Sequence, residues 1–159
     1  MLSLRPKENR ACMAVHLWVN NHGRLERYKF VRGIMRSAAR LTYEQVQAAA
    51  DGLTDDVTGP LMDAVIKPLY EAYNALWLAR EERGALDLDL PERQILVNEK
   101  GEMTGVKQRL RLDSHKLIEE FMIMANVAAA SALEDKKAPC VYRIHDKPDP
   151  AKIDSVREF

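Results

Sequence analysis

The chain has 159 residues, 47% of them hydrophobic and 30% charged, which is enough for about one domain with a modest core. No apolar run has the length of a membrane helix, and no leader-like segment follows the first basic residues, so we expect neither a membrane protein nor a secreted one. The formal net charge is zero, which argues against an isolated nucleic-acid-binding module, because such modules are usually basic.

The charges are unevenly distributed along the chain. Residues 1–40 carry nine basic and two acidic side chains, residues 41–100 five basic and twelve acidic, and residues 101–159 ten of each. This favours a piece that meets its ligand on one side, although solvated faces of different charge would give the same counts. Cys12 and Cys140 are interpreted as separate apolar residues, not as a disulfide, so we expect a reducing bacterial cytoplasm.

The first forty residues predict a β-hairpin. Apolar and polar residues alternate over 12–22 and again over 25–31, and Asn21-His22-Gly23 supplies a turn between them. In the second strand, strict alternation predicts that the side chains of Leu25 and Tyr28 lie on opposite faces of the strand.

Two helices are predicted next. Thr42 and Gln45 have the spacing of a capping box, which opens a short helix that ends at Asp51-Gly52. A longer helix is predicted over about 60–83, in which Pro68 marks either a kink or the true start. Gly84 is suited to the position after its C-terminus.

The second half predicts a hairpin over 93–110, a helix over about 114–134 capped by Asp113 or Ser114, a strand over 140–144 and a final helical stretch. The fold class is therefore α+β, with antiparallel hairpins packed against three to four helices. The late strand has no following partner and both ends are abrupt. We therefore expect residues 1–159 to be one partial domain truncated at both ends; a naturally short protein is the alternative.

The helix over 114–134 carries the most unusual pattern, because it is apolar on nearly all sides and is expected to be buried on most of them. Glu119 and Asn126 would then lie together on a mostly apolar face, where a carboxylate needs a partner. That partner is either an arginine from another element or a ligand hydroxyl such as a ribose 2′-OH. Glu120 lies on another side and is expected to reach a basic residue.

A second candidate site is the segment after the predicted strand, in which Arg143 and His145 lie beside Asp146 and Lys147. The alternative is structural, with Asp146 forming a turn and His145 acting as a core or hinge residue. The four histidines are scattered and no metal-binding motif is present. We therefore expect no catalytic residue and no metal site in this sequence.

Several blocks in the sequence resemble the catalytic RNB domain of the ribonuclease II and ribonuclease R family, in the family's order and spacing, and are closer to the ribonuclease R branch. The blocks are Ser3-Leu-Arg-Pro6, Arg10-Ala-Cys-Met13, Gly23-Arg-Leu25, Tyr28-Lys-Phe30, Ala39-Arg-Leu-Thr-Tyr43, Ala79-Arg-Glu-Glu-Arg-Gly84, His115-Lys-Leu-Ile-Glu-Glu-Phe-Met-Ile-Met-Ala-Asn126 and Tyr142-Arg-Ile-His-Asp-Lys-Pro148.

The resemblance implies a processive 3′→5′ exoribonuclease that hydrolyses single-stranded RNA to nucleoside monophosphates with Mg²⁺. The family's metal-binding pattern D-x-x-x-x-x-D-x-D-D, its clamping tyrosine, its S-P-I-R-R-Y motif and its OB-type RNA-binding domains have no counterpart here. In the family's E-E-x-M-x-x-A-N helix, the first glutamate, which matches Glu119, contacts the ribose of the terminal nucleotide. Leu88 replaces a phenylalanine that stacks on the RNA 3′ end, and leucine cannot stack as an aromatic ring does.

The resemblance therefore predicts an internal fragment of an exoribonuclease that forms part of the RNA channel, needs Mg²⁺ only in the parent enzyme and is inactive alone. Its expected partner is single-stranded RNA, bound through the parent, and apolar surface left uncovered favours self-association. The alternatives are a self-standing regulatory protein derived from the same domain and a weak RNA-binding module that uses the basic residues of 1–40.

Overall fold

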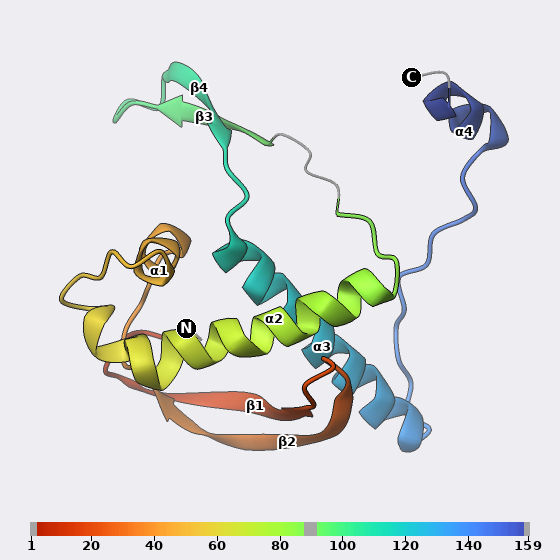
Figure 1. Ribbon diagram of the computed structural model, residues 1–159, viewed down its shortest axis with the longest axis horizontal. Helices are drawn as coiled ribbons and strands as arrows, with labels where there is room; N and C mark the ends of the chain where they lie inside the picture. The colour runs from red at the N-terminus through yellow and green to blue at the C-terminus, as the bar shows by residue number, and fades with distance from the viewer. Residues whose placement is uncertain (1–2, 88–91, 158–159) are drawn as a thin grey trace. The chain divides into compact units, whose positions relative to one another are not determined.

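A computed structural model describes residues 3–87 and 92–157 of the chain (Figure 1). The described residues form an α+β fold with two separate antiparallel hairpins, as predicted. They divide into two compact units, one ending at Ala128 and the other beginning at Ala129. No helix among the described residues combines the length and the apolar character needed to cross a membrane.

The first hairpin pairs β1 (Asn9–Val19) with β2 (Leu25–Arg36). The expected alternation fails at one place, because Trp18 pairs with Arg27 and Val19 pairs with Leu25, which leaves Glu26 as an extra residue in β2. This β-bulge shifts the alternation by one residue. Leu25 therefore shares the half-buried face with Tyr28, and the prediction that the two face opposite sides is wrong.

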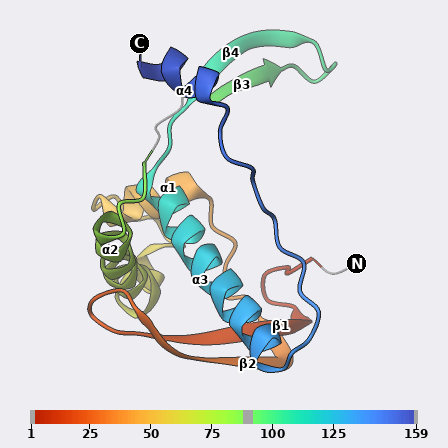
Figure 2. The same ribbon diagram turned by 90° about the vertical axis from the view of Figure 1, so that its right-hand side faces the viewer.

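The turn of this hairpin lies against the helix α2 (Lys67–Glu82). Gly23 is buried and adopts a φ of +68°, a conformation that favours glycine. A Cβ atom at this position would lie 2.2 Å from the carbonyl oxygen of Ala75 and 2.7 Å from the Cβ of Ala79. Figure 2 shows the hairpin running beneath α2. Only glycine allows this close approach.

The short helix α1 (Tyr43–Ala50) begins with the predicted capping box. The Thr42 hydroxyl accepts a hydrogen bond from the Gln45 backbone at 3.2 Å, and the Gln45 side chain accepts one from the Thr42 backbone at 3.0 Å. These two bonds satisfy the backbone donors of Gln45 and Thr42 at the start of the helix. After the end of the helix, Gly52 has a φ of +94°.

The long helix starts in stages. A 3₁₀ turn (Gly59–Leu61) and a π-helical turn (Met62–Ile66) precede α2, and Pro68 lies in the first turn of α2. Proline therefore marks the true start, where its missing N–H costs nothing. At the other end, Ala85 donates to the Arg80 carbonyl and Gly84 donates to that of Glu81, which together form a Schellman motif.

The core lies between α1, α2 and the part of α3 (Asp113–Asp135) that belongs to the first unit. Burial raises the pKa of Tyr73 to about 12, because the phenolate is disfavoured away from water. The buried apolar side chains are Ala49, Ile66, Tyr73, Leu76, Ala79, Leu117 and Ala128.

The cap of α3 differs from the prediction. The Ser114 hydroxyl donates to the carbonyl oxygen of Tyr43 at 2.9 Å, so it links two helices and does not cap its own. The backbone carbonyl of Leu112 accepts from the His115 and Lys116 amides, and Nδ1 of His115 accepts from the Leu112 amide at 3.2 Å. Leu112 thus occupies the capping position, with His115 reaching back to it.

The second hairpin pairs β3 (Glu92–Val97) with β4 (Met103–Arg109), close to the predicted range. Its described apolar side chains are exposed, with Ile95 and Val97 both at 61%.

The second unit contains the end of α3, an irregular segment and α4 (Pro150–Arg157). The predicted strand over 140–144 is wrong: these residues have no regular structure, and Val141 and Ile144 are 99% and 84% exposed. A strand requires a paired neighbour for its backbone groups, and no described residue provides one.

Candidate nucleic-acid interface

Glu119 and Glu120 are neighbours on α3 but occupy different environments. Glu120 is buried, with 4% of its side chain exposed, and its Oε1 atom lies 2.8 Å from Nη1 of Arg80 on α2. Glu119 is 46% exposed. The expectation that Glu119 is the buried carboxylate is therefore wrong, whereas the expected pairing of Glu120 with a basic residue is confirmed. Successive helical residues point about 100° apart, so one turns toward α2 and the other toward solvent.

Glu119 belongs to a group of four charged residues, Asp87, Arg111, Lys116 and Glu119, which we call the Arg111 cluster. Nη1 of Arg111 lies 2.5 Å from Oδ1 of Asp87, and Nη2 lies 2.6 Å from Oε2 of Glu119. Nζ of Lys116 lies 3.1 Å from Oδ2 of Asp87. Arg111 thus joins two carboxylates, and two cations share Asp87.

The cluster stabilises the charged forms of Asp87 and Arg111. The hydrogen bond from Lys116, and then that from Arg111, hold the pKa of Asp87 below its usual value of 3.8. The hydrogen bond to Glu119, with a further one to Asp87, raises the pKa of Arg111. Asp87 and Arg111 are therefore both charged at neutral pH.

One oxygen of Glu119 is available for a ligand. Oε2 is held by Arg111, while no described residue donates a hydrogen bond to Oε1. A carboxylate with one anchored oxygen has a fixed orientation, and its second oxygen is an acceptor for a hydroxyl group.

The C-terminal end of α2 holds the chain that leads to the cluster. Nη2 of Arg80 donates to the backbone oxygen of Leu86 at 3.3 Å, next to Asp87. The indole of Trp77 donates to Glu81 at 2.9 Å, and its ring lies 4.8 Å from Nζ of Lys116 and 5.7 Å from the guanidinium of Arg80. The Trp77 ring therefore lies near both Lys116, which binds Asp87, and Arg80, which binds Glu120.

The other predicted site residues are not gathered at this cluster. Asn126 is exposed on α3, two turns beyond Glu119, or about 10 Å along the helix axis. Arg143 and His145 are exposed in the irregular segment of the second unit, and Leu88 lies outside the described residues.

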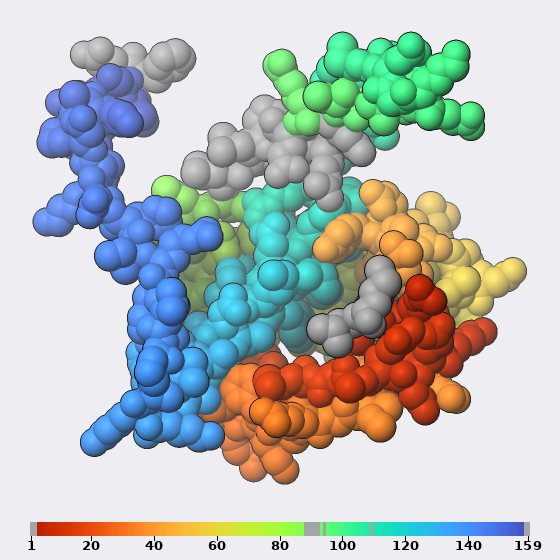
Figure 3. Space-filling view, turned by 180° about the vertical axis from the view of Figure 1, so that it is seen from behind, coloured from red at the N-terminus to blue at the C-terminus, as the bar shows by residue number. Residues whose placement is uncertain are grey.

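The predicted burial of α3 on most sides is also wrong for the described residues, because Met122, Ile123 and Val127 are 59%, 42% and 49% exposed. Figure 3 shows that part of α3, in cyan, is visible at the surface.

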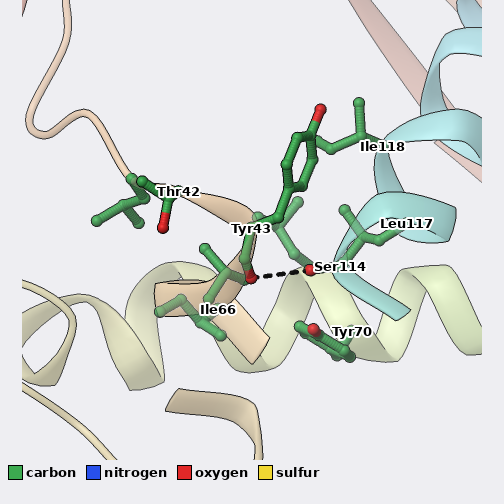
Figure 4. A pocket seen from close by; sticks show the side chains of 10 residues that line it. Thr42, Tyr43, Ile66, Tyr70, Ser114, Leu117 and Ile118 are labelled. Atoms are coloured by element: carbon green, nitrogen blue, oxygen red, sulfur yellow. Dashed lines mark hydrogen bonds between the residues drawn. The ribbon is translucent and has the colours of Figure 1, made fainter. Parts of the chain in front are cut away.

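A small apolar pocket of about 180 Å³ lies between α1, α2 and the first turn of α3 (Figure 4). Tyr43 on its wall stacks on His115 with ring centroids 4.1 Å apart, and Ser114 is fixed by its bond to the Tyr43 carbonyl. The pocket is lined by Leu41, Thr42, Tyr43, Val46, Ile66, Leu69, Tyr70, Ser114, Leu117 and Ile118.

A larger hollow of about 370 Å³ lies beside the turn of the first hairpin. It is lined by Gly23, Arg24, Leu25, Leu76, Arg83, Glu120, Ile123, Met124 and Val127.

Sequence reasoning did not identify Asp87, Arg111 and Lys116 as members of the site. Their spacing follows no motif, since Asp87 lies 24 residues before its partner Arg111. Arg80 and Lys116 do lie within blocks that resemble the family, Ala79–Gly84 and His115–Asn126, but neither was assigned a role.

Comparison with known proteins decides the family. The model of the RNB domain matches residues 1–159. The chain belongs to the RNB-domain family. Ribonuclease R of Escherichia coli (strain K12) is 40% identical over 159 residues, which cover 99% of this chain and 19% of that protein. Ribonuclease R of Aquifex aeolicus (strain VF5) is 35% identical over 162 residues, which cover 100% of this chain and 23% of that protein. This RNB chain thus spans about a fifth of the length of these relatives.

Solved structures agree with the fold of this RNB chain. The structure of Mycoplasma genitalium RNase R in complex with ribose methylated single-stranded RNA superimposes with a TM-score of 0.88 at 24% identity, covering 98% of this chain and 24% of that one. A complex of the same enzyme with double-stranded RNA gives a TM-score of 0.87. At this identity the likeness establishes the architecture.

Proposed function

We propose that this RNB chain is part of a bacterial cytoplasmic exoribonuclease of the ribonuclease R type and forms one wall of its RNA channel. The parent enzyme would degrade single-stranded RNA from its 3′ end to nucleoside monophosphates with Mg²⁺. The proposal is supported by the match of the RNB domain to the whole chain and by the names of its relatives. Residues 1–159 would be one partial RNB domain within that enzyme.

The observation that carries the proposal is the geometry of Glu119. Its Oε2 atom is anchored by Arg111 at 2.6 Å, its side chain is 46% exposed, and no described residue donates a hydrogen bond to Oε1. An oriented carboxylate oxygen suits a ribose 2′-OH, the group that distinguishes RNA from DNA. Asn126, Arg143 and His145 are proposed to make further RNA contacts in the assembled enzyme, and Leu88 to occupy the position of the stacking ring.

The residues that the structure describes do not fit a Mg²⁺ site. The described residues contain no group of three or more His, Cys, Asp or Glu side chains placed to hold a metal ion, and the sequence lacks the family's aspartate pattern. Hydrolysis by this family's chemistry needs metal ions to activate water and neutralise the phosphate. We therefore assign no metal-dependent step to this chain and propose that it is inactive alone.

The proposed ribose contact is tested by comparing binding of RNA and DNA oligonucleotides of one sequence. Glu119→Ala should weaken RNA binding in fluorescence anisotropy and leave DNA binding unchanged, because DNA lacks the 2′-OH. The matched control is Glu82→Ala, an exposed glutamate at the end of α2. An equal effect on both nucleic acids, or no effect on either, would contradict the proposed role.

Inactivity is tested separately. The purified chain, incubated with Mg²⁺ and a labelled single-stranded oligoribonucleotide, should release no nucleoside monophosphates. Release that persists through purification would show that the chain carries its own catalytic centre.

We also propose that the isolated chain self-associates through its exposed apolar side chains, among them Met122 and Val127 on α3. Sedimentation velocity should show concentration-dependent association that Met122→Glu weakens. A monomer at all concentrations would exclude this.

A further inference from the structure

The β1–β2 hairpin presents two aromatic and two basic side chains on one face, which we call the outer face: His16, Trp18, Arg27 and Lys29. In the register, His16 pairs with Lys29, and Trp18 pairs with Arg27. All four side chains are exposed, while the intervening Leu17 is half-buried on the opposite side. The outer face is therefore directed away from the helices that cover the hairpin.

Three of the four side chains of the outer face, His16, Trp18 and Arg27, lie close together. The guanidinium carbon of Arg27 lies 3.8 Å from the centroid of the Trp18 ring, and the His16 and Trp18 centroids are 6.0 Å apart. The indole is 38% exposed. A cation over the ring fixes the indole in place, so that its exposed part is already positioned for stacking.

Within the described part of the chain, no acidic side chain neutralises the positive charge of this face. No described carboxylate lies within ion-pair distance of Arg27 or Lys29, in contrast to Lys67 and Lys116, which are paired with Asp63 and Asp87. The nearby Glu26 accepts a hydrogen bond from the Asn20 amide. The surface is thus complementary to an anion.

We propose that the outer face binds single-stranded nucleic acid without strong sequence preference. Trp18 stacks on a base, and Arg27 and Lys29 contact the backbone. The two cations are alternate residues of one strand, so their Cα atoms lie about 7 Å apart, along a path that a sugar–phosphate chain can follow. Aromatic platforms within basic surfaces are how sequence-tolerant proteins bind single strands. This inference goes beyond the channel-wall function, because it needs neither Glu119 nor the metal-binding acids.

The sequence has two tryptophans, Trp18 and Trp77. The first experiment uses the full chain with Trp77→Phe, in which Trp18 is the remaining tryptophan. Oligo(U) or oligo(dT) should quench its fluorescence, and the affinity should fall as salt rises from about 50 to about 200 mM. The double variant Arg27→Gln with Lys29→Gln should lower the magnitude of the slope of log affinity against log salt by about 1.4, because two phosphate contacts are lost.

A second experiment uses fluorescence anisotropy in the chain that keeps both tryptophans. Trp18→Ala should reduce the affinity about tenfold, and Trp18→Phe should keep it.

The matched control is Lys100→Gln with Lys107→Gln, two exposed lysines of the second hairpin region, which should leave affinity and slope unchanged. The two proposals give different signatures, since outer-face variants should weaken RNA and DNA equally, whereas Glu119→Ala should weaken only RNA. No quenching, unchanged slope in the Arg27 and Lys29 variant, or unaltered affinity in Trp18→Ala would overturn the inference. Equal competition by polyglutamate would instead identify an acidic polypeptide as the partner.

Discussion

Gly23 shows how a single residue determines the packing of the first unit. A side chain at this position would meet the Ala75 carbonyl at 2.2 Å, and the backbone has a φ of +68°. Gly23→Ala should therefore lower the free energy of unfolding by about 2–4 kcal/mol, the sum of a left-handed backbone cost and overpacking. Urea unfolding measures the change.

The control is Gly52→Ala, because Gly52 also has a positive φ, +94°, but has no atom near an added Cβ. It should cost only the backbone part, about 1 kcal/mol. Equal losses in the two variants would mean that the contact of the hairpin turn with α2 contributes nothing.

Asp87 gives the candidate site a pH dependence. Because its pKa is lower in the folded chain than the usual 3.8, its contribution to stability is present above about pH 4 and is lost as the pH falls through the lower value. Asp87→Asn should thus reduce stability at about pH 7, and the difference from the wild type should shrink toward about pH 3. Urea midpoints across this range test it; a difference that grows in acid would contradict the ion pairs with Arg111 and Lys116.

At the scale of elements, three local signals in the sequence correctly predicted where helices begin and end. The capping box at Thr42, the helix start at Pro68 and the Schellman glycine Gly84 act within a few residues, and all are present. The strand over 140–144 was wrongly predicted because residues that favour strands do not themselves supply a pairing partner.

The candidate site was only partly predictable, because its side chains also depend on partners that are distant in the sequence. The sequence singled out the glutamates of α3, but their orientation depends on Arg80, forty residues away from Glu120. An apolar pattern on most sides of a helix does not decide which carboxylate is buried. The members of the Arg111 cluster meet only through tertiary packing, so no spacing rule could have assembled them.

The capping box makes a prediction about α1. Thr42→Ala should lower the free energy of unfolding by about 1 kcal/mol, because the Gln45 amide loses its acceptor. Thr42→Ser keeps the hydroxyl and should lose much less. If both variants are equally destabilised in urea unfolding, the methyl group of Thr42, and not its hydroxyl, stabilises the helix.

The ion pair between α2 and α3 makes a second prediction at this scale. Arg80→Ala should cost about 3–5 kcal/mol, because it leaves the buried Glu120 without its cation. Replacing both residues, as in Arg80→Met with Glu120→Leu, should recover most of the loss. The exposed pair of Lys67 and Asp63 is the control, and its removal should cost less than about 1 kcal/mol. A double variant no more stable than Arg80→Ala would contradict this account.

For the whole molecule, the irregular segment inside the second unit predicts where a protease cuts first. The segment over 139–149 has no regular secondary structure, and Arg143 and Lys147 are exposed within it. Proteases cleave backbone that is free of hydrogen-bonded structure. Brief trypsin digestion should therefore cut after Arg143 before it cuts after Lys29 or Arg32, which are exposed but held in the β1–β2 ladder. Mass spectrometry of the early products gives the order. Early cleavage after Lys29 or Arg32, with Arg143 protected, would mean that the segment over 139–149 is ordered in solution and the first hairpin is not.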